Sequence, residues 1–397
     1  MRKFSIAERR NRLARRHFLS ARGSATRVTA GLLGLHATDP ATPYLSLWAR
    51  CPDFTVADLD RLLYQRRSAI KHLAMRRTLW LVNTDDFPLV QSAASAAVAD
   101  NERRRLIGDL HKAGVTDDGD GWLNQAGAAV LRHLGEHGPA NTSELRAALP
   151  ELAGTYDPAP GKPWGGSTPV APRVLTVLAA SGAVVRGPND GSWTTSRPRW
   201  VPARDWLDQA GAPPPEGTAR AELVRRWLHT FGPASVTDIK WWFGTTLTAT
   251  RVALAAIGAV EVDMHGNPGY ALAEDLGTEA DAPPWAALLP ALDPTTMGWS
   301  ERDWYLGEHR DQIFDRNGNA GPTAWWNGRV VGGWCQETEP GQPGRVRLQL
   351  LEDPGADGRR ALQQRADELT AWLDGARISP RFPSPLSKSG RGPLAPA

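Results

Sequence analysis

Two stretches of this chain repeat one pattern, and the repeat is the strongest constraint on its fold. Residues 137–149 read His-Gly-Pro-Ala-Asn-Thr-Ser-Glu-Leu-Arg-Ala-Ala-Leu, and residues 231–243 read Phe-Gly-Pro-Ala-Ser-Val-Thr-Asp-Ile-Lys-Trp-Trp-Phe. In each copy Gly-Pro ends an amphipathic helix, and a polar residue that can cap the next helix follows. A duplicated pattern of this length indicates two copies of one supersecondary unit.

The sequence on either side of the repeat completes the same unit twice. The first copy is predicted to have helices 122–136 and 169–180 and strands 183–186 and 192–195. The second copy is predicted to have helices 219–230 and 247–257 and strands 259–264 and 270–273. Three helices followed by a two-stranded wing predict a winged helix-turn-helix unit.

We expect a mainly helical α+β chain with tandem winged helix-turn-helix units. A third, degenerate unit is expected at the N-terminus, with helices 6–19, 24–33, 44–49 and 56–65 and strand 78–82. Short β-like runs occur later, at 286–289, 323–326, 329–334 and 345–351, and a helix at 360–373 comes after them. Because Asn327-Gly328 is typical of a tight hairpin turn, these runs predict a C-terminal β-barrel-like domain.

The predicted domains follow from these elements and from proline-rich linkers at 213–217 and 282–284. They are a degenerate winged helix that holds a candidate active-site turn (1–118), two winged helices (119–212 and 213–281), a β-rich domain (282–380) and a disordered tail (381–397). The tail is rich in Pro, Ser, Gly and basic residues, a composition typical of disorder.

Positive charge is concentrated in the first third of the chain. The net charge is only +3, but residues 1–112 carry 20 Lys and Arg against 10 Asp and Glu, and the N-terminal basic stretch, residues 1–28, has one acidic residue. A basic part in a nearly neutral protein favours a polyanionic partner such as DNA, and the alternative is a solvated helix face. The predicted phosphate contacts are Arg66, Arg67, Arg76, Arg77, Arg103, Arg104, Arg105 and Lys162.

The chain has 17 Trp, and most of them are expected to pack in cores. Trp325 and Trp326 alternate in one predicted strand, so at least one of them could face outward. An exposed aromatic ring next to DNA can stack on a base. We therefore add both residues to the predicted DNA contacts, with a core position as the alternative.

Several other classes of protein are not indicated. The sequence has no apolar run of about 18 residues that would span a membrane, and the basic N-terminus lacks the apolar core of a signal peptide. Cys51 and Cys335 lie far apart without metal-ligand spacing, which favours a reduced, cytoplasmic setting. No P-loop, catalytic serine or catalytic cysteine motif is present. We expect a monomer without cofactor or metal.

One short turn concentrates reactive side chains. His36-Ala37-Thr38-Asp39-Pro40 follows an apolar run and precedes a second amphipathic one. A histidine can hold or activate water at neutral pH, and a carboxylate can orient it or stabilise a developing positive charge. The alternative is that Asp39 caps the helix that starts near Pro40 and that His36 is only buried.

Three stretches resemble the winged-helix DNA glycosylases of the AlkZ-like family. They are residues 33–50 (Leu-Gly-Leu-His-Ala-Thr-Asp-Pro to Tyr-Leu-Ser-Leu-Trp-Ala-Arg), 289–294 (Leu-Pro-Ala-Leu-Asp-Pro) and 327–334 (Asn-Gly-Arg-Val-Val-Gly-Gly-Trp). The resemblance implies three tandem winged helices and a β-barrel around a DNA-sized channel. It also implies removal of N-alkylated purines, bulky adducts included, without a lysine Schiff base.

The family's motif is Gln-apolar-Gln or Gln-apolar-Asp, and the matching positions here are His36-Ala37-Thr38. His36 would replace the first Gln, and Thr38 or Asp39 the second. The resemblance thus implies a monofunctional glycosylase that hydrolyses the N-glycosidic bond of alkylated or bulky-adducted purines in double-stranded DNA. His36 would place water, Thr38 would assist, and Asp39 would stabilise the cationic sugar. The alternatives are a non-catalytic winged-helix DNA-binding regulator and a protein that sequesters a small molecule in a Trp-rich interior.

Overall fold

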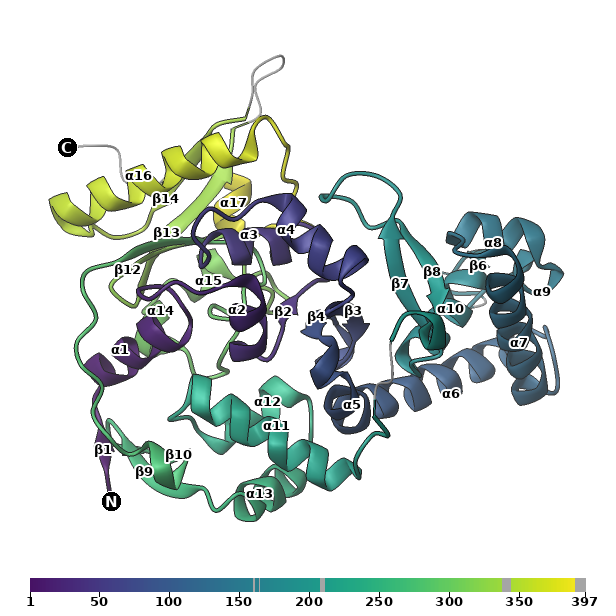
Figure 1. Ribbon diagram of the computed structural model, residues 1–397, viewed down its shortest axis with the longest axis horizontal. Coiled ribbons are helices and arrows are strands. Elements are labelled where there is room, and N and C mark those ends of the chain that lie inside the picture. Colours follow the sequence, from purple (N-terminus) through teal and green to yellow (C-terminus); the bar gives the residue numbers. More distant parts are fainter. Residues whose placement is uncertain (160, 164, 208–210, 338–343, 390–397) are drawn as a thin grey trace. The chain divides into compact units, whose positions relative to one another are not determined.

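The computed structural model describes residues 1–159, 161–163, 165–207, 211–337 and 344–389 (Figure 1). They form a mixed α/β protein with small sheets, which divides into two compact units. The composite unit contains Met1–Leu59 and Ala221–Ala397, and the middle unit contains Asp60–Arg220. The boundaries of these two units differ from the predicted domain boundaries. The five-domain division stays a prediction. Among the described residues, no helix is long and apolar enough to cross a membrane.

The middle unit is mostly helical, and its described residues also form short antiparallel strand pairs. Its helices are η1 (Arg61–Gln65), η2 (Met75–Arg77), η3 (Thr84–Asp86), α5 (Phe87–Val90), η4 (Gln91–Ser95), α6 (Ala96–Lys112), α7 (Gly119–His137), α8 (Thr142–Ala148), α9 (Pro150–Ala153), α10 (Ala171–Ala180) and η5 (Ala203–Asp205). Its strands pair antiparallel: β3 (Ala69–Leu73) with β4 (Leu79–Asn83), β5 (Thr155–Tyr156) with β6 (Thr168–Pro169), and β7 (Val184–Asn189) with β8 (Pro198–Pro202).

The composite unit combines both ends of the chain. Its helices are α1 (Ile6–Arg16), α2 (Ala25–Gly31), α3 (Thr42–Trp48), α4 (Val56–Asp60), α11 (Glu216–Phe231), α12 (Val236–Phe243), α13 (Leu247–Ala256), η6 (Ala273–Asp275), α14 (Asp303–Leu306), α15 (Arg310–Ile313), α16 (Gly355–Leu373) and α17 (Pro385–Ser389). Its strands are β1 (Lys3–Phe4), β2 (Leu35–His36), β9 (Val260–Met264), β10 (Asn267–Ala271), β11 (Ala286–Leu289), β12 (Thr323–Trp326), β13 (Arg329–Gln336) and β14 (Val346–Leu350).

The repeated segments begin their helices in the same way. The Asn141 side chain accepts the N–H of Glu144, whose carboxylate accepts the N–H of Asn141. Ser235 and Asp238 exchange the same pair of hydrogen bonds at the start of α12. These reciprocal caps satisfy N–H groups that would otherwise lack partners at a helix start. The order of three helices and a hairpin therefore occurs twice, as α7, α8, α10, β7–β8 and as α11, α12, α13, β9–β10.

The first hairpin differs from the prediction in its second strand. Residues 192–195 form a turn, in which the Thr195 N–H donates to the Ser192 carbonyl over 3.0 Å. The Asn189 side chain donates to the carbonyls of Ser192 and Thr195, at 2.9 and 3.0 Å. These bonds close a longer loop than a tight turn requires, so the second strand starts only at Pro198.

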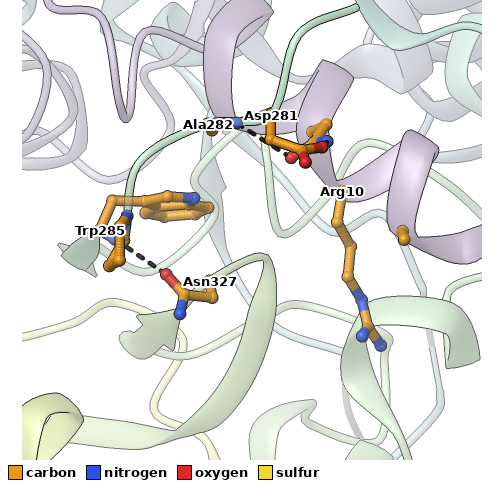
Figure 2. Close-up of a pocket in the computed structure, with 8 residues that line it drawn as sticks. Arg10, Asp281, Ala282, Trp285 and Asn327 are labelled. Atoms are coloured by element: carbon orange, nitrogen blue, oxygen red, sulfur yellow. Dashed lines mark hydrogen bonds between the residues drawn. The ribbon is translucent and has the colours of Figure 1, made fainter. Parts of the chain in front are cut away.

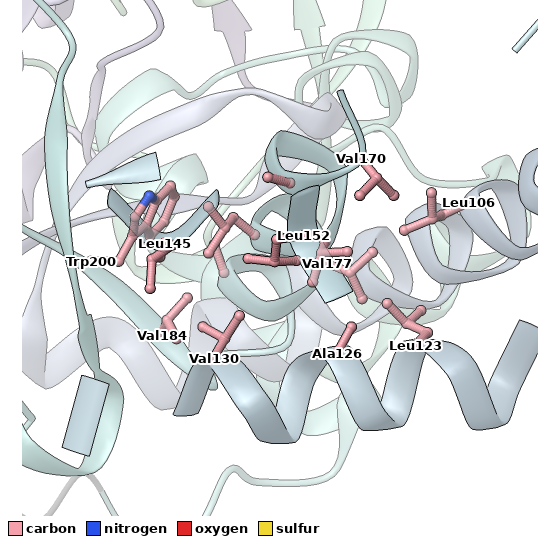
Figure 3. Packing of buried hydrophobic residues seen from close by; sticks show 14 of the residues in the cluster. Leu106, Leu123, Ala126, Val130, Leu145, Leu152, Val170, Val177, Val184 and Trp200 are labelled. Carbon is pink, nitrogen blue, oxygen red and sulfur yellow. The ribbon is translucent and has the colours of Figure 1, made fainter. Parts of the chain in front are cut away.

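A continuous hydrophobic core fills the middle unit (Figure 3). The face of α7 that carries Leu123, Ala126 and Val130 packs into a cluster to which α6 contributes Leu106 and α10 contributes Val177. The spacing of three to four residues places these side chains on one face of each helix. The sequence pattern predicts α7 and α10 of this core, but it does not predict α6.

Aromatic side chains form much of the composite-unit core. Trp227 stacks on Phe231 with ring centroids 5.1 Å apart, and Phe231 meets Trp299 edge-on at 5.4 Å. Tyr305 stacks on Trp325 at 5.2 Å. Offset and edge-on arrangements of this kind add stabilisation to that of buried area. Core packing therefore accounts for these tryptophans.

The C-terminal strands form an open sheet, and the β-barrel-like prediction is wrong. The four antiparallel strands follow the order β11–β12–β13–β14, and among the described residues no pairing joins the outer strands β11 and β14. Helix α16 packs on this sheet. Four short strands are too few to close around a filled interior, so a helix covers the sheet instead. The hairpin turn is as predicted, since Asn327 and Gly328 both have positive φ, 46° and 81°.

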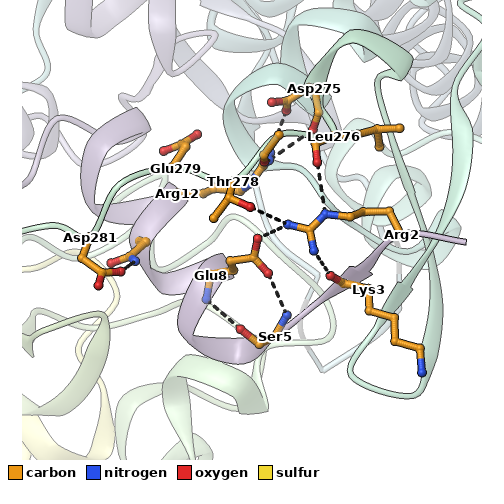
Figure 4. A network of polar contacts seen from close by, with 12 residues as sticks. Arg2, Lys3, Ser5, Glu8, Arg12, Asp275, Leu276, Thr278, Glu279 and Asp281 are labelled. Atoms are coloured by element: carbon orange, nitrogen blue, oxygen red, sulfur yellow. Dashed lines mark hydrogen bonds and ion pairs between the residues drawn. The ribbon is translucent and has the colours of Figure 1, made fainter.

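The N-terminal basic stretch is largely used inside the composite unit (Figure 4). Strand β1 pairs in parallel with β9. Arg12 and Arg16 of α1 bind the Asp275 carboxylate at 2.8 and 2.6 Å, and Arg2 forms an ion pair with Glu8. These arginines tie α1 to the segment that follows β10. They are therefore not the polyanion-facing surface that their density in the sequence suggests.

Candidate active-site turn and predicted DNA contacts

The turn of residues 36–39 lies between β2 and α3 and is largely enclosed. His36 is 3% exposed and Asp39 is 4% exposed, whereas Thr38 is half-buried. The Thr38 N–H donates to Nδ1 of His36 over 3.4 Å. In this contact Nδ1 of the imidazole is the acceptor. The orientation of the imidazole is thus tied to the backbone of the turn.

Asp39 has a structural role as well as a chemical one. Its Oδ1 accepts the Ala41 N–H at 3.2 Å, and its Oδ2 accepts the Arg381 N–H at 2.9 Å. The Asp39 carbonyl accepts the Thr42 N–H at 3.2 Å, so this residue forms the turn that leads into α3. Burial raises the pKa of Asp39, while the N–H donors of Arg381 and Ala41 and the charge of Arg381 oppose that rise.

Helix α3 is fixed by a fully buried ion pair. Both guanidinium NH groups of Arg50 donate to the Asp293 carboxylate, at 2.8 and 2.6 Å, and both side chains are 0% exposed. The Ser46 hydroxyl donates to the same carboxylate at 2.7 Å. The Thr42 hydroxyl donates to the Ala291 carbonyl at 2.8 Å. The helix that follows the turn is therefore bound along its length to the segment after β11.

The polar network extends to α1. Arg50 also donates to the His17 carbonyl at 2.9 Å and to the Thr295 hydroxyl at 2.8 Å, and that hydroxyl lies 2.8 Å from Nδ1 of His17. Burial and the neighbouring Arg50 charge hold the pKa of His17 well below its usual value. His17 is thus a neutral structural group, and α1, α3 and the 293–295 segment form one rigid frame behind the turn.

All the predicted phosphate contacts lie in the middle unit, and several of them are already paired. Arg77 binds Glu102 at 2.5 and 3.0 Å, and Arg103 binds Asp120 at 2.6 Å. Arg104 donates to the Asn101 side chain at 2.5 Å. An arginine with an acidic partner has fewer donors, and less net charge around it, for a phosphate.

Other predicted contacts are more available. The side chains of Arg66, Arg105 and Lys162 are exposed, and no hydrogen bond or ion pair joins them to another described residue. Arg67 is also exposed, and its guanidinium lies 4.3 Å from the Trp206 ring centroid. Arg76 is half-buried. Among the predicted phosphate contacts, exposure and the lack of a described partner therefore favour Arg66, Arg105 and Lys162.

Three of these arginines have an unusual backbone. The φ angles of Arg67, Arg76 and Arg77 are 53°, 54° and 59°, in the left-handed region that non-glycine residues seldom adopt. Each such residue costs about 1–3 kcal/mol and is found more often at functional sites than elsewhere. This observation keeps the 66–77 segment among the candidate contacts.

The predicted base-stacking role does not fit Trp325. Its ring is 0% exposed, donates its N–H to the Thr323 hydroxyl at 2.9 Å and lies between Tyr305 and Trp285. Thr323 and Trp325 are two residues apart in β12 and therefore share a face of the sheet, whereas Trp326 lies on the opposite face. Trp325 is therefore a core residue, and only the half-buried Trp326 keeps an accessible edge.

Two hollows in the composite unit lie apart from the turn residues themselves. One, of about 380 Å³, is lined by Arg10, Asp281, Trp285 and Asn327 (Figure 2), and Arg10 already donates to the Trp304 carbonyl at 3.1 Å. The other, of about 310 Å³, is lined by Ala30, Gly31, Leu33, Arg225, Arg226, His229 and Thr230. Neither lining includes His36, Thr38 or Asp39.

Sequence reasoning missed the residues that hold the turn. Ser46 of α3 and Arg50, two residues beyond the end of that helix, are four residues apart, a spacing that could have indicated a shared partner. Asp293 stands in the 289–294 stretch but has no local signal for a partner more than 240 residues away. Arg381 lies in a proline-rich segment without helical or strand periodicity, so nothing in the sequence indicates its contact with Asp39.

Comparisons with known proteins identify relatives among DNA glycosylases. An interstrand DNA cross-link repair glycosylase of Streptomyces sahachiroi is 27% identical over 170 residues, which are 41% of this chain and 45% of that protein. The matched part therefore spans less than half of that relative. The structure of Streptomyces sahachiroi DNA glycosylase AlkZ has the same fold, with a TM-score of 0.69 at 21% identity over 96% of this chain and 99% of that one.

The family-level match covers both the turn and the open sheet. The sequence profile described as DNA glycosylase AlkZ-like matches residues 29–372. That range includes β2, α3, both copies of the repeat and strands β11–β14. Since the match extends over most of the chain, this protein belongs to the AlkZ-like DNA glycosylase family.

Proposed function

We propose that this protein is a monofunctional DNA glycosylase that hydrolyses the N-glycosidic bond of alkylated or bulky-adducted purines in double-stranded DNA. The observation that carries the proposal is the family match over residues 29–372, which contains the rigidly framed turn 36–39. The cross-link repair glycosylase among its relatives supports a damaged-DNA substrate. We further propose that it acts as a cytoplasmic monomer with two winged-helix units and a degenerate third.

The chemistry that this substrate requires is modest. An N-alkylated purine already carries positive charge, so it leaves without a strong acid. The enzyme must stabilise an oxocarbenium-like sugar and place one water molecule, as in other glycoside hydrolyses. Water is the only co-reactant, and no cofactor enters the proposed reaction.

The three residues of the turn suit different parts of this task. Asp39 would stabilise the cationic sugar, since each carboxylate oxygen has a second lone pair beyond the N–H that it accepts. Thr38 is the most accessible of the three and would assist in placing water. His36, whose ring is held by the Thr38 N–H at Nδ1, would place the water molecule.

The experiment that tests this proposal measures base release under single-turnover conditions, on duplexes that contain 7-methylguanine or a bulky purine adduct. His36→Ala and Asp39→Asn are expected to lower release by about 10²–10⁴-fold, the usual contribution of a positioned acid–base group. His36→Gln restores the family's residue and is expected to retain most of the activity. His265→Asn changes an exposed histidine with positive φ, which Asn tolerates, and serves as the control.

The alternative is a non-catalytic winged-helix DNA-binding protein, which the available cations of the middle unit also support. It predicts sequence-preferring affinity for undamaged duplex and no abasic product. An alkaline cleavage assay for abasic sites beside a gel shift separates the two proposals. Absence of abasic product from every damaged duplex, with affinity for undamaged DNA intact, would sink the glycosylase proposal.

A further inference from the structure

The segment after α16 returns to the candidate active-site turn and is anchored at its start. The Gln336 side chain of β13 donates to the Ala376 carbonyl at 2.9 Å and accepts the Ile378 N–H at 2.9 Å. One amide therefore grips the chain on both sides of Arg377. These two hydrogen bonds fix the position of the chain shortly after α16 ends at Leu373.

A second anchor lies beyond Arg381. Ser384 and Leu386 are 1% and 5% exposed. A Cβ atom at Gly321 would lie 2.3 Å from Oγ of Ser384, and one at Gly333 would lie 3.0 Å from the Leu386 side chain. Side chains at both positions would displace the segment. The expected disordered tail therefore includes an ordered part up to α17, while residues 390–397 lie outside the described residues.

Between the anchors, Arg381 contacts the turn in two ways. Its N–H donates to Oδ2 of Asp39 at 2.9 Å, and its guanidinium lies 3.5 Å from the Thr38 carbonyl as a weak donor. The Arg381 side chain is exposed, so most of its donors remain in contact with solvent. The family match ends at residue 372, so Arg381 lies beyond the part of the chain that the family profile covers, whereas Thr38 and Asp39 lie within it.

We propose that Arg381 is a positioning residue of the candidate active site, which orients the Asp39 carboxylate through its backbone N–H and supplies the positive charge beside it. The proposal rests on the proposed glycosylase function, and it extends the site to a segment outside the family match. It assigns Arg381 no contact with the reacting atoms.

The charge matters because Asp39 is useful for sugar stabilisation only as a carboxylate. Burial raises the pKa of Asp39 and so favours its neutral form, whereas the Arg381 charge acts in the opposite direction. His36 is the other titratable group on the same turn, held through Thr38. Loss of the Arg381 charge should therefore raise the pKa of Asp39 further and extend its protonated range upward in pH.

The test compares Arg381→Ala, Arg381→Lys and Arg377→Ala in the full-length protein, by base release from a 7-methylguanine duplex between pH 5 and pH 9. Arg377 is an exposed arginine of the same segment, so its variant has the same change in net charge. In Arg381→Ala the acid limb of the profile should move to higher pH, with release slower than wild type on the acid side and nearly normal at alkaline pH. Arg381→Lys and Arg377→Ala should keep the normal profile.

Two results would overturn the proposal. One is an unchanged profile for Arg381→Ala, and the other is a loss of equal size at every pH, which indicates a folding role only. A readout without DNA separates this proposal from the proposed function. In protein labelled with ¹⁵N-arginine, the Arg381 amide signal should titrate with Asp39, and the titration should vanish in Asp39→Asn.

An Arg381 amide that does not titrate refutes the contact, even if the protein releases bases. A titrating amide in a protein that releases no base refutes the glycosylase function and, with it, the role in the reaction.

Discussion

Asp293→Asn should be among the most damaging conservative substitutions in the composite unit. The Asp293 carboxylate accepts four hydrogen bonds: two from Arg50, one from the Ser46 hydroxyl and one from the Thr295 N–H at 2.9 Å. An amide of the same shape has one acceptor oxygen and places an NH₂ group against donors. The Arg50 guanidinium would remain at 0% exposure without its counter-charge.

The size of the effect follows from that burial. Breaking one partner of a buried ion pair costs about 3–5 kcal/mol, because the remaining charge stays desolvated. For a unit of this size, each kcal/mol lowers Tm by about 2–4 °C, so Asp293→Asn should lower it by roughly 6–20 °C. Replacing both partners, as Arg50→Met with Asp293→Leu, should recover much of the loss, since no charge is then left buried.

The assay is urea and thermal unfolding followed by tryptophan fluorescence, with Asp367→Asn as the matched control. Asp367 pairs with Arg345 at 3.6 Å, but the two side chains are 57% and 67% exposed, so its loss should cost at most about 1 kcal/mol. Base release should also fall in Asp293→Asn at temperatures where the variant is folded, because α3 carries the turn. A free energy of unfolding within about 1 kcal/mol of the control would refute the reasoning.

Three further predictions concern charge and packing. Arg105→Ala should reduce the slope of log affinity against log salt for duplex DNA by about 0.9. Arg77→Ala should change this slope less, because Arg77 is paired with Glu102. Equal slopes for the two variants would argue against Arg105 as the phosphate contact. Asp275→Asn should lower the free energy of urea unfolding at pH 7 by about 1–3 kcal/mol. Burial alone would raise the pKa of Asp275, but the hydrogen bonds and charges of its arginine partners hold it below its usual value, so this stability is lost as pH falls and the difference from wild type should shrink by pH 3. Trp325→Ala should cost about 3–5 kcal/mol in thermal unfolding and Trp326→Ala clearly less, and the reverse order would contradict the core position of Trp325.

Capping and turn residues within a segment are enough to predict the helix or hairpin in which they occur. The repeated Gly-Pro-Ala segments carry their own caps at Asn141 and Ser235, and the Asn327-Gly328 pair carries the backbone preference of its turn. What local signals could not supply was sheet closure. Alternating apolar runs look the same in a barrel strand and in a strand of an open sheet, so the cover provided by α16 was not predictable from the strands.

The candidate site shows the same limit more sharply. The turn itself was found because its polar residues are adjacent in sequence, but its partners Asp293 and Arg381 are far from it along the chain. Basic clusters in the sequence have the same limit. The number of arginines in a segment does not show which of them form ion pairs within the protein. Arg12 pairs with Asp275, whereas the Arg105 side chain has no described partner.

The two interpretations of Asp39, as a residue that shapes the turn and as a catalytic group, are compatible in physical terms. A carboxylate that already accepts two fixed N–H donors loses little freedom when it meets a cationic sugar, so the entropic cost of orienting it has been met in folding. Its remaining lone pairs, together with the Arg381 charge that opposes protonation, leave it able to face positive charge. Because an alkylated purine leaves readily, this preorganised carboxylate can suffice although the position of the family's first Gln is taken by His36. Exchange of His36 for the family's Gln should then matter less than loss of the charge that opposes protonation of Asp39, so Arg381→Ala at low pH should impair release more than His36→Gln.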